Sequence, residues 1–193
     1  MLIDRYLPRC DASLEFETTV DAPASEVYRA IREADLRDPI ISALFALREL
    51  PQRLARRLHG QPPPPAPPKV TFGTMIQDGP GWTLLAEQPD QELVVGSVGR
   101  FWERDYGGRP VTAEEFTGFT EPGYAKLVIG FAVRPGPTGE TILRYEARTL
   151  TTDDTARRKF RRYWRLIRPG VSLVMRAGLH RIKLTAEHQG VAT

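Results

Sequence analysis

Few residues in this sequence have the types and spacing that chemistry requires. The three histidines, His59, His180 and His188, are scattered, and none has a second histidine or a cysteine at metal-ligand spacing. The sequence contains no GxSxG, HExxH or P-loop motif and no glycine pattern typical of dinucleotide binding. The single cysteine, Cys10, has no base near it in the sequence and is expected to be inert. We therefore predict no metal and no cofactor, and we assign no catalytic residue.

The strongest polar candidates are Glu146 and Arg148, which flank Ala147 in an alternating segment. If these side chains faced a cavity, Arg148 could bind a carboxylate or an oxyanion, and Glu146 could orient a polar group of a ligand. In the alternative interpretation they lie outside, paired with charges on neighbouring strands. We favour the second interpretation, because an alternating strand of an antiparallel sheet normally leaves one face in contact with water.

Positive charge is concentrated near the end of the chain. Between Asp153 and Glu187 the sequence has ten Lys or Arg and three acidic residues, whereas the whole chain carries a net charge of +3. Such a patch can contact the phosphates of nucleic acid or of an anionic membrane. We favour a simpler interpretation, in which the arginines are the solvated back of an amphipathic helix that buries Phe160, Trp164 and Ile167. Nucleic acid is not an expected partner.

Hydrophobic periodicity predicts the elements that must position these residues. Residues 12–20 alternate like a strand with one wet face, and an apolar stripe from Val27 to Ala34 predicts a short helix. A second helix is expected from Asp38 to about His59. Six prolines in residues 61–69 predict an extended surface connector. Residues 1–9 are expected to form an extended arm.

The second half of the chain has the pattern of an antiparallel sheet followed by one long helix. The expected strands are residues 82–87 and 92–98 as a hairpin, a short strand at 116–120, and strands at 124–133 and 141–150. The helix is predicted over 153–187, with its stripe interrupted at Pro169. This order predicts an α+β domain in which a curved antiparallel sheet wraps around the long C-terminal helix, with two shorter helices after the first strand.

The run Val20-Asp21-Ala22-Pro23-Ala24-Ser25-Glu26-Val27-Tyr28, at the end of the first strand, and this order of elements resemble one known superfamily. It is the START-like, or polyketide cyclase/dehydrase, superfamily (SRPBCC), which has the helix-grip fold. The resemblance implies one START-like domain over residues 1–193. It also implies an internal pocket for a lipid, a polyketide or another small apolar molecule. Because the superfamily holds carriers, receptors and enzymes, the fold does not by itself assign an activity.

The candidate pocket residues combine aromatic area, polar groups and one adaptable methionine. They are Phe16, Trp102, Phe131, Tyr145, Glu146, Arg148, Trp164 and Met175.

Our leading hypothesis is a non-catalytic protein that binds or carries a small hydrophobic ligand between the sheet and the last helix. A cyclase or dehydratase would instead use Tyr145, Glu146 or Arg148 as acid, base or oxyanion donor. A third hypothesis is an interaction protein that uses the basic side of the last helix. No apolar run reaches the ~20 residues of a membrane span, no signal-peptide pattern is present, and a single cysteine suits a reducing compartment, so we expect a cytoplasmic protein.

Overall fold

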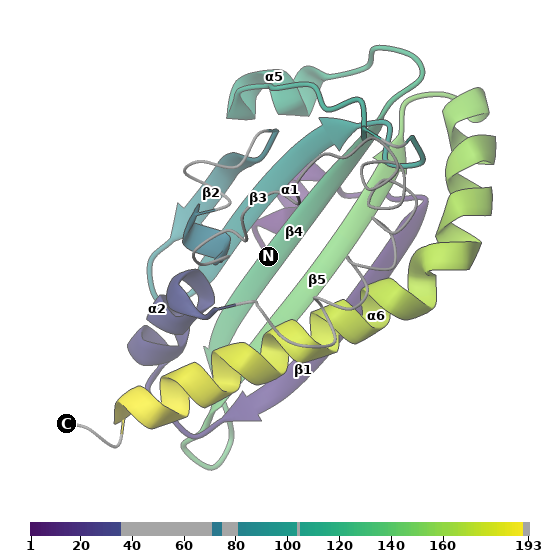
Figure 1. Cartoon of the computed structure of the whole chain (residues 1–193). Helices are drawn as coiled ribbons and strands as arrows, with labels where there is room; N and C mark the ends of the chain where they lie inside the picture. Colours follow the sequence, from purple (N-terminus) through teal and green to yellow (C-terminus); the bar gives the residue numbers. More distant parts are fainter. Residues whose placement is uncertain (36–70, 75–80, 104, 191–193) are drawn as a thin grey trace, which may run out of the picture.

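The computed structural model describes residues 1–35, 71–74, 81–103 and 105–190. Its centre is a five-stranded antiparallel sheet with the strand order β1-β5-β4-β3-β2 (Figure 1). The strands are β1 (Ala12–Val20), β2 (Thr83–Gln88), β3 (Glu92–Gly99), β4 (Ala125–Pro135) and β5 (Thr141–Thr151). The helices are α1 (Ile3–Tyr6), α2 (Ala24–Glu33), α5 (Ala113–Gly118) and α6 (Asp154–Gly190). The helix expected at 38–59 and the connector at 61–69 lie outside the described residues.

Helix α6 is a single element of 37 residues that packs on one face of the sheet, here called the inner face. Pro169 lies inside it, and Figure 1 shows the helix changing direction in the part that contains this proline. A proline in a helix interior removes one hydrogen bond and crowds the preceding turn, which explains the bend. We call residues 154–168 the first section and 170–190 the second. An antiparallel sheet closed by one long C-terminal helix confirms the predicted α+β helix-grip fold.

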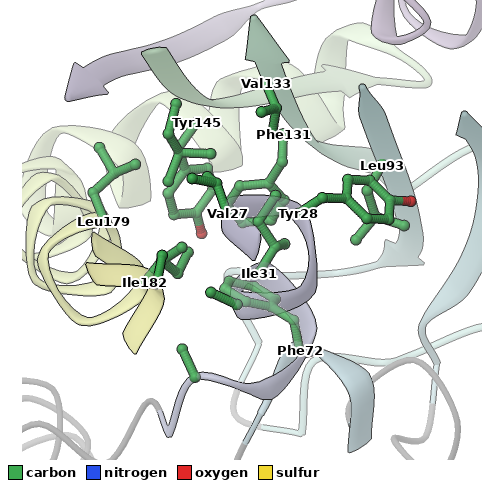
Figure 2. Packing of buried hydrophobic residues seen from close by; sticks show 14 of the residues in the cluster. Val27, Tyr28, Ile31, Phe72, Leu93, Phe131, Val133, Tyr145, Leu179 and Ile182 are labelled. Atoms are coloured by element: carbon green, nitrogen blue, oxygen red, sulfur yellow. The ribbon is translucent and has the colours of Figure 1, made fainter. Parts of the chain in front are cut away.

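The larger hydrophobic core lies between the inner face and the helices α2 and α6. Figure 2 shows Val27 and Ile31 from α2, Phe131 and Val133 from β4, Tyr145 from β5, and Leu179 and Ile182 from α6 gathered in this layer. The rings of Phe131 and Tyr145 lie 4.4 Å apart between centroids, and Phe72 meets Phe131 edge-on at 4.8 Å. The second section of α6 therefore covers this core and contributes side chains to it.

A second core covers the opposite, outer face of the sheet. The extended arm predicted for residues 1–9 is wrong, because Ile3–Tyr6 forms one helical turn. Ile3 and Leu7, four positions apart, are fully buried in this outer core. Gly130 of β4 lies beneath Ile3, and a Cβ there would come within 3.1 Å of the Ile3 side chain. Any side chain at Gly130 would therefore crowd Ile3, so glycine suits the close approach of this turn to the sheet.

The short strand predicted at 116–120 is also wrong, because residues 113–118 form α5. Thr112 and Glu115 make a capping box at its start: the Glu115 N–H donates to the Thr112 hydroxyl at 3.2 Å, and the Thr112 N–H donates to the Glu115 carboxylate at 2.7 Å. Phe116 is fully buried in the outer core. One apolar anchor and a satisfied cap thus select helix over strand.

We predict that Phe131→Ala lowers the free energy of unfolding by about 3–5 kcal/mol, because the ring is fully buried among aromatic neighbours. Trp164→Ala should cost only about 1–2 kcal/mol, since its ring is half-buried. Urea unfolding followed by circular dichroism measures both values. Equal losses for the two variants would contradict this placement of Trp164.

Candidate functional site

The predicted pocket residues lie on both faces of the sheet. Phe16, Phe131, Tyr145, Trp164 and Met175 belong to the inner core or pack against it. Glu146 and Arg148 point the other way, because successive residues of β5 alternate between faces and Tyr145 points inward. The eighth residue, Trp102, follows β3 in a turn that belongs to neither core cluster.

The deepest inner residues are closely packed against one another. Phe131 and Met175 are 1% exposed, and Tyr145 is 5% exposed. Burial raises the pKa of the Tyr145 hydroxyl above its ordinary value of 10.0, so the phenol stays neutral. These three side chains belong to the closely packed part of the inner core.

Four apolar residues that pack against the inner core are only half-buried. Leu127 of β4, Ala147 of β5, Phe16 of β1 and Trp164 of α6 all pack against the edge of the inner core. Tyr145, Ala147 and Thr149 are alternate residues of β5 and share one face. Phe16 pairs with Tyr145, Leu14 pairs with Ala147, and Leu127 pairs with Thr149. Phe16 and Leu127 therefore lie on the same face as Ala147 and close to it. The Trp164 ring stacks on the buried Phe160 ring at 5.8 Å. Within the described part of the chain, the inner face therefore has a group of neighbouring apolar residues that are only partly buried.

A positive charge lies at the border of this group. The guanidinium carbon of Arg176, from the second section of α6, is 4.5 Å from the centroid of the Phe16 ring. Arg176 is otherwise exposed, so its N–H donors remain available at the edge of the apolar area. The sequence did not single out Leu127, Ala147 or Arg176 as candidate site residues. Their partial exposure depends on neighbours distant in sequence.

On the outer face, Glu146 is the centre of a buried ion-pair network. Its carboxylate is 4% exposed and accepts from Arg148 at 2.5 Å and from Arg144 at 3.1 Å. Arg148 also donates to Asp4 at 2.7 Å and to the Leu7 carbonyl at 3.0 Å. The hydrogen bond from Arg148 holds the pKa of Asp4 below its ordinary value. The network fastens the N-terminal turn to the sheet.

The candidate catalytic residues lie on different faces of the sheet, which excludes the simplest catalytic arrangement. Tyr145 lies on the inner face, whereas Glu146 and Arg148 lie on the outer face, so the sheet stands between the groups that were candidates for acid, base and oxyanion donor. Within the described ranges, no group of three His, Cys, Asp or Glu side chains could hold a metal ion. The indole N–H of Trp102 is buried and makes no hydrogen bond with the residues described.

Two hollows are lined by residues of the described chain. One, of about 390 Å³, lies where the β2–β3 turn meets the end of β4 and includes none of the eight predicted residues. The other, of about 500 Å³, lies against the first section of α6 and is lined by Asp11, Arg158, Arg161, Arg162, Trp164 and Arg165. Among the described helices, none is both long and apolar enough to span a membrane.

No protein-family model and no curated protein matches the sequence. Solved structures of similar architecture do match. Protein MLL2253 from Mesorhizobium loti is 14% identical over 92% of this chain and 98% of that chain, with a TM-score of 0.43. Protein Ms6760 from Mycobacterium smegmatis is 12% identical over 89% of this chain and 88% of its own, with a TM-score of 0.43.

The matching structures also include polyketide aromatase/cyclases, which belong to the superfamily that the sequence resembles. One is the Zhui aromatase/cyclase from Streptomyces sp. R1128, 14% identical over 92% of this chain and 94% of that chain, with a TM-score of 0.29. At these identities and TM-scores, function has to be inferred from the geometry of the chain itself.

The ion-pair network on the outer face leads to a second prediction. Arg148→Ala should lower the free energy of unfolding by about 3 kcal/mol, because it leaves the buried Glu146 carboxylate with one ion pair. As a matched control, Arg134→Ala removes an exposed pair with Glu17 and should cost less than about 1 kcal/mol. Chemical denaturation of both variants measures the difference, and similar losses would contradict a buried role for Arg148.

Proposed function

We propose that the chain binds or carries a small hydrophobic molecule of the lipid or polyketide class between the inner face of the sheet and the first section of α6. The observation that supports this proposal is the half-buried apolar surface formed by Phe16, Leu127, Ala147 and Trp164. Water in contact with such a surface is unfavourable, and covering it gains about 25 cal/mol for each Å² removed from water. An apolar ligand bound there would remove this surface from water.

The proposed ligand has an anionic group at one end. Arg176 lies over the Phe16 ring at the border of the surface, where its guanidinium can donate to a carboxylate or a sulfonate. The apolar body of the ligand would rest on Leu127 and Ala147, and the charged end would stay near solvent. In this arrangement the anionic end of the ligand pairs with Arg176 while it stays in contact with water.

Binding is favoured over catalysis for a geometric reason. Acid–base chemistry needs two groups within hydrogen-bond reach of one reacting atom. Glu146 and Arg148 are engaged with each other on the outer face, away from Tyr145. A cyclase or dehydratase built on these three residues is therefore not the function that we propose.

Native mass spectrometry of the protein purified from its own host tests the proposal first, because a retained ligand adds its mass to the chain. In solution, the probe is 1-anilinonaphthalene-8-sulfonate, which joins apolar rings to a sulfonate. We expect the native protein to bind it and Ala147→Phe to weaken binding at least tenfold by filling the surface beside Leu127.

The matched control is Ala86→Phe, the same enlargement at a half-buried alanine of the outer core, which should leave the probe affinity unchanged. Arg176→Gln should weaken the sulfonate probe several-fold but not the neutral N-phenyl-1-naphthylamine. Thermal melts of each variant confirm folding. Undiminished probe binding by a folded Ala147→Phe variant would refute the proposed site.

A further inference from the structure

The side of α6 that faces away from the sheet has a composition that ligand binding does not explain. From Thr155 to Ala186 the sequence has ten Lys or Arg and no Asp or Glu, and six of the ten are exposed residues of the first section. Of the other four, Arg176 lies over Phe16, and Arg157 and Lys183 pair with carboxylates. A helix that only needs a solvated outer side normally mixes both signs of charge, because opposite charges three or four positions apart stabilise it. A run of like charge is slightly destabilising for the helix itself, so the composition points to an external partner.

The first section of α6 separates an inward side from an outward side. Phe160 is buried, and Trp164 and Ile167 are half-buried, so these residues mark the inward side. The outward side, called the basic face below, consists of exposed cationic residues. They are Arg158, Lys159, Arg161, Arg162, Arg165 and Arg168.

The basic face has little internal neutralisation. Arg157, at its margin, pairs with Asp11 at 2.9 Å and with Asp154 at 2.6 Å. Arg158 donates to the Thr155 hydroxyl. None of the six residues of the basic face makes an ion pair with a carboxylate in the described part of the chain. Their charges are therefore available to an anionic surface.

Two exposed leucines lie on α6, one on each side of Pro169. Leu166 is 81% exposed, the most exposed large hydrophobic side chain among the described residues, and Leu173 is 42% exposed. Leu166 belongs to the first section, which carries the basic face, and Leu173 belongs to the second section beyond the bend. Leu166 follows Arg162 by four positions and directly follows Arg165, so apolar and cationic side chains are interleaved.

A hollow at the margin between the basic face and Trp164 provides a place for a phosphate. Four arginines line the hollow of about 500 Å³, together with Trp164 and Asp11. The Asp11 carboxylate is already engaged by the Thr151 hydroxyl at 2.5 Å and by Arg157 at 2.9 Å. The remaining donors are guanidinium groups, which match the geometry of phosphate oxygens.

We propose that the basic face of α6 docks on an anionic lipid bilayer, with the arginines on the lipid phosphates and Leu166 and Leu173 inserted at the headgroup boundary. Electrostatic attraction alone would suit nucleic acid equally well. The interleaved leucines favour the bilayer, because a phosphodiester backbone offers them no apolar environment. The inference does not rest on ligand binding: the two sites share Trp164, but the arginines and leucines of the docking surface are not part of the proposed ligand site, so either proposal can fail alone.

Flotation with vesicles tests the docking. The native protein should bind vesicles of phosphatidylcholine with about 30% phosphatidylserine at about 0.1 M salt, and high salt should release it. Vesicles of phosphatidylcholine alone should not bind. Equal binding to both vesicle types, or no binding to the anionic vesicles at low salt, would overturn the proposal.

Paired variants separate the two contributions. Arg162→Glu with Arg165→Glu should weaken vesicle binding at least about tenfold, since each cation near an anionic surface changes the partition roughly fivefold. Arg5→Glu with Arg9→Glu makes the same change in net charge at exposed positions of the N-terminal segment and should have little effect. A similar loss in both double variants would mean that net charge, not the basic face, controls binding.

Leu166→Gln should weaken vesicle binding about fivefold, whereas Leu84→Gln, at a leucine of β2 that is 36% exposed, should not. A duplex oligonucleotide is the competing ligand. If the oligonucleotide bound more tightly than the anionic vesicles, and Leu166→Gln left both affinities unchanged, the surface would be a nucleic-acid site and the bilayer proposal would be wrong.

Discussion

The structure depends on the two-residue period of β4 and β5, strands with neighbours on both edges and a hydrophobic layer on each face. In such strands a shift of one residue would exchange the two layers, so the register is strongly constrained. The pairing of Phe131 with Tyr145 directs both rings inward. The same alternation directs Glu146 outward. This one constraint determines which candidate residues can meet each other, and therefore which kinds of chemistry the site allows.

The outer face shows how a charged group can be structural. Glu146 is buried because the N-terminal turn covers it, and it is compensated because arginines two positions away on each side of it in β5 share its face. Asp4 and the Leu7 carbonyl extend the network to α1. Buried ion pairs of this kind give positional specificity more reliably than net stability. Here they hold Ile3 and Leu7 in the outer core.

Helix α6 has different roles on its two sides and in its two sections. The second section completes the inner core with Met175, Leu179 and Ile182. The first section, before Pro169, offers Trp164 to the half-buried apolar surface on one side and arginines to solvent on the other. An apolar ligand and an anionic bilayer are chemically compatible partners for such a helix, since a molecule of low solubility is exchanged most readily at a membrane. In these proposals, the two sections on either side of Pro169 divide packing and recognition between them.

Local periodicity in the sequence was sufficient for the strands β1, β2, β3, β4 and β5, for α2 and α6, and hence for the fold class, because those patterns are properties of neighbouring residues. It was not sufficient for α1 or α5, whose short segments become helical through burial of Ile3 and Phe116 against a distant sheet. The alternation in β5 also separated Tyr145 from Glu146 and favoured an outward, solvated Glu146, but it did not show that the outer face is covered and that Glu146 is buried. Only tertiary structure decided that, because the partner of Arg148 is Asp4, 144 positions away. The half-buried surface likewise exists only once the helix and the sheet are in contact.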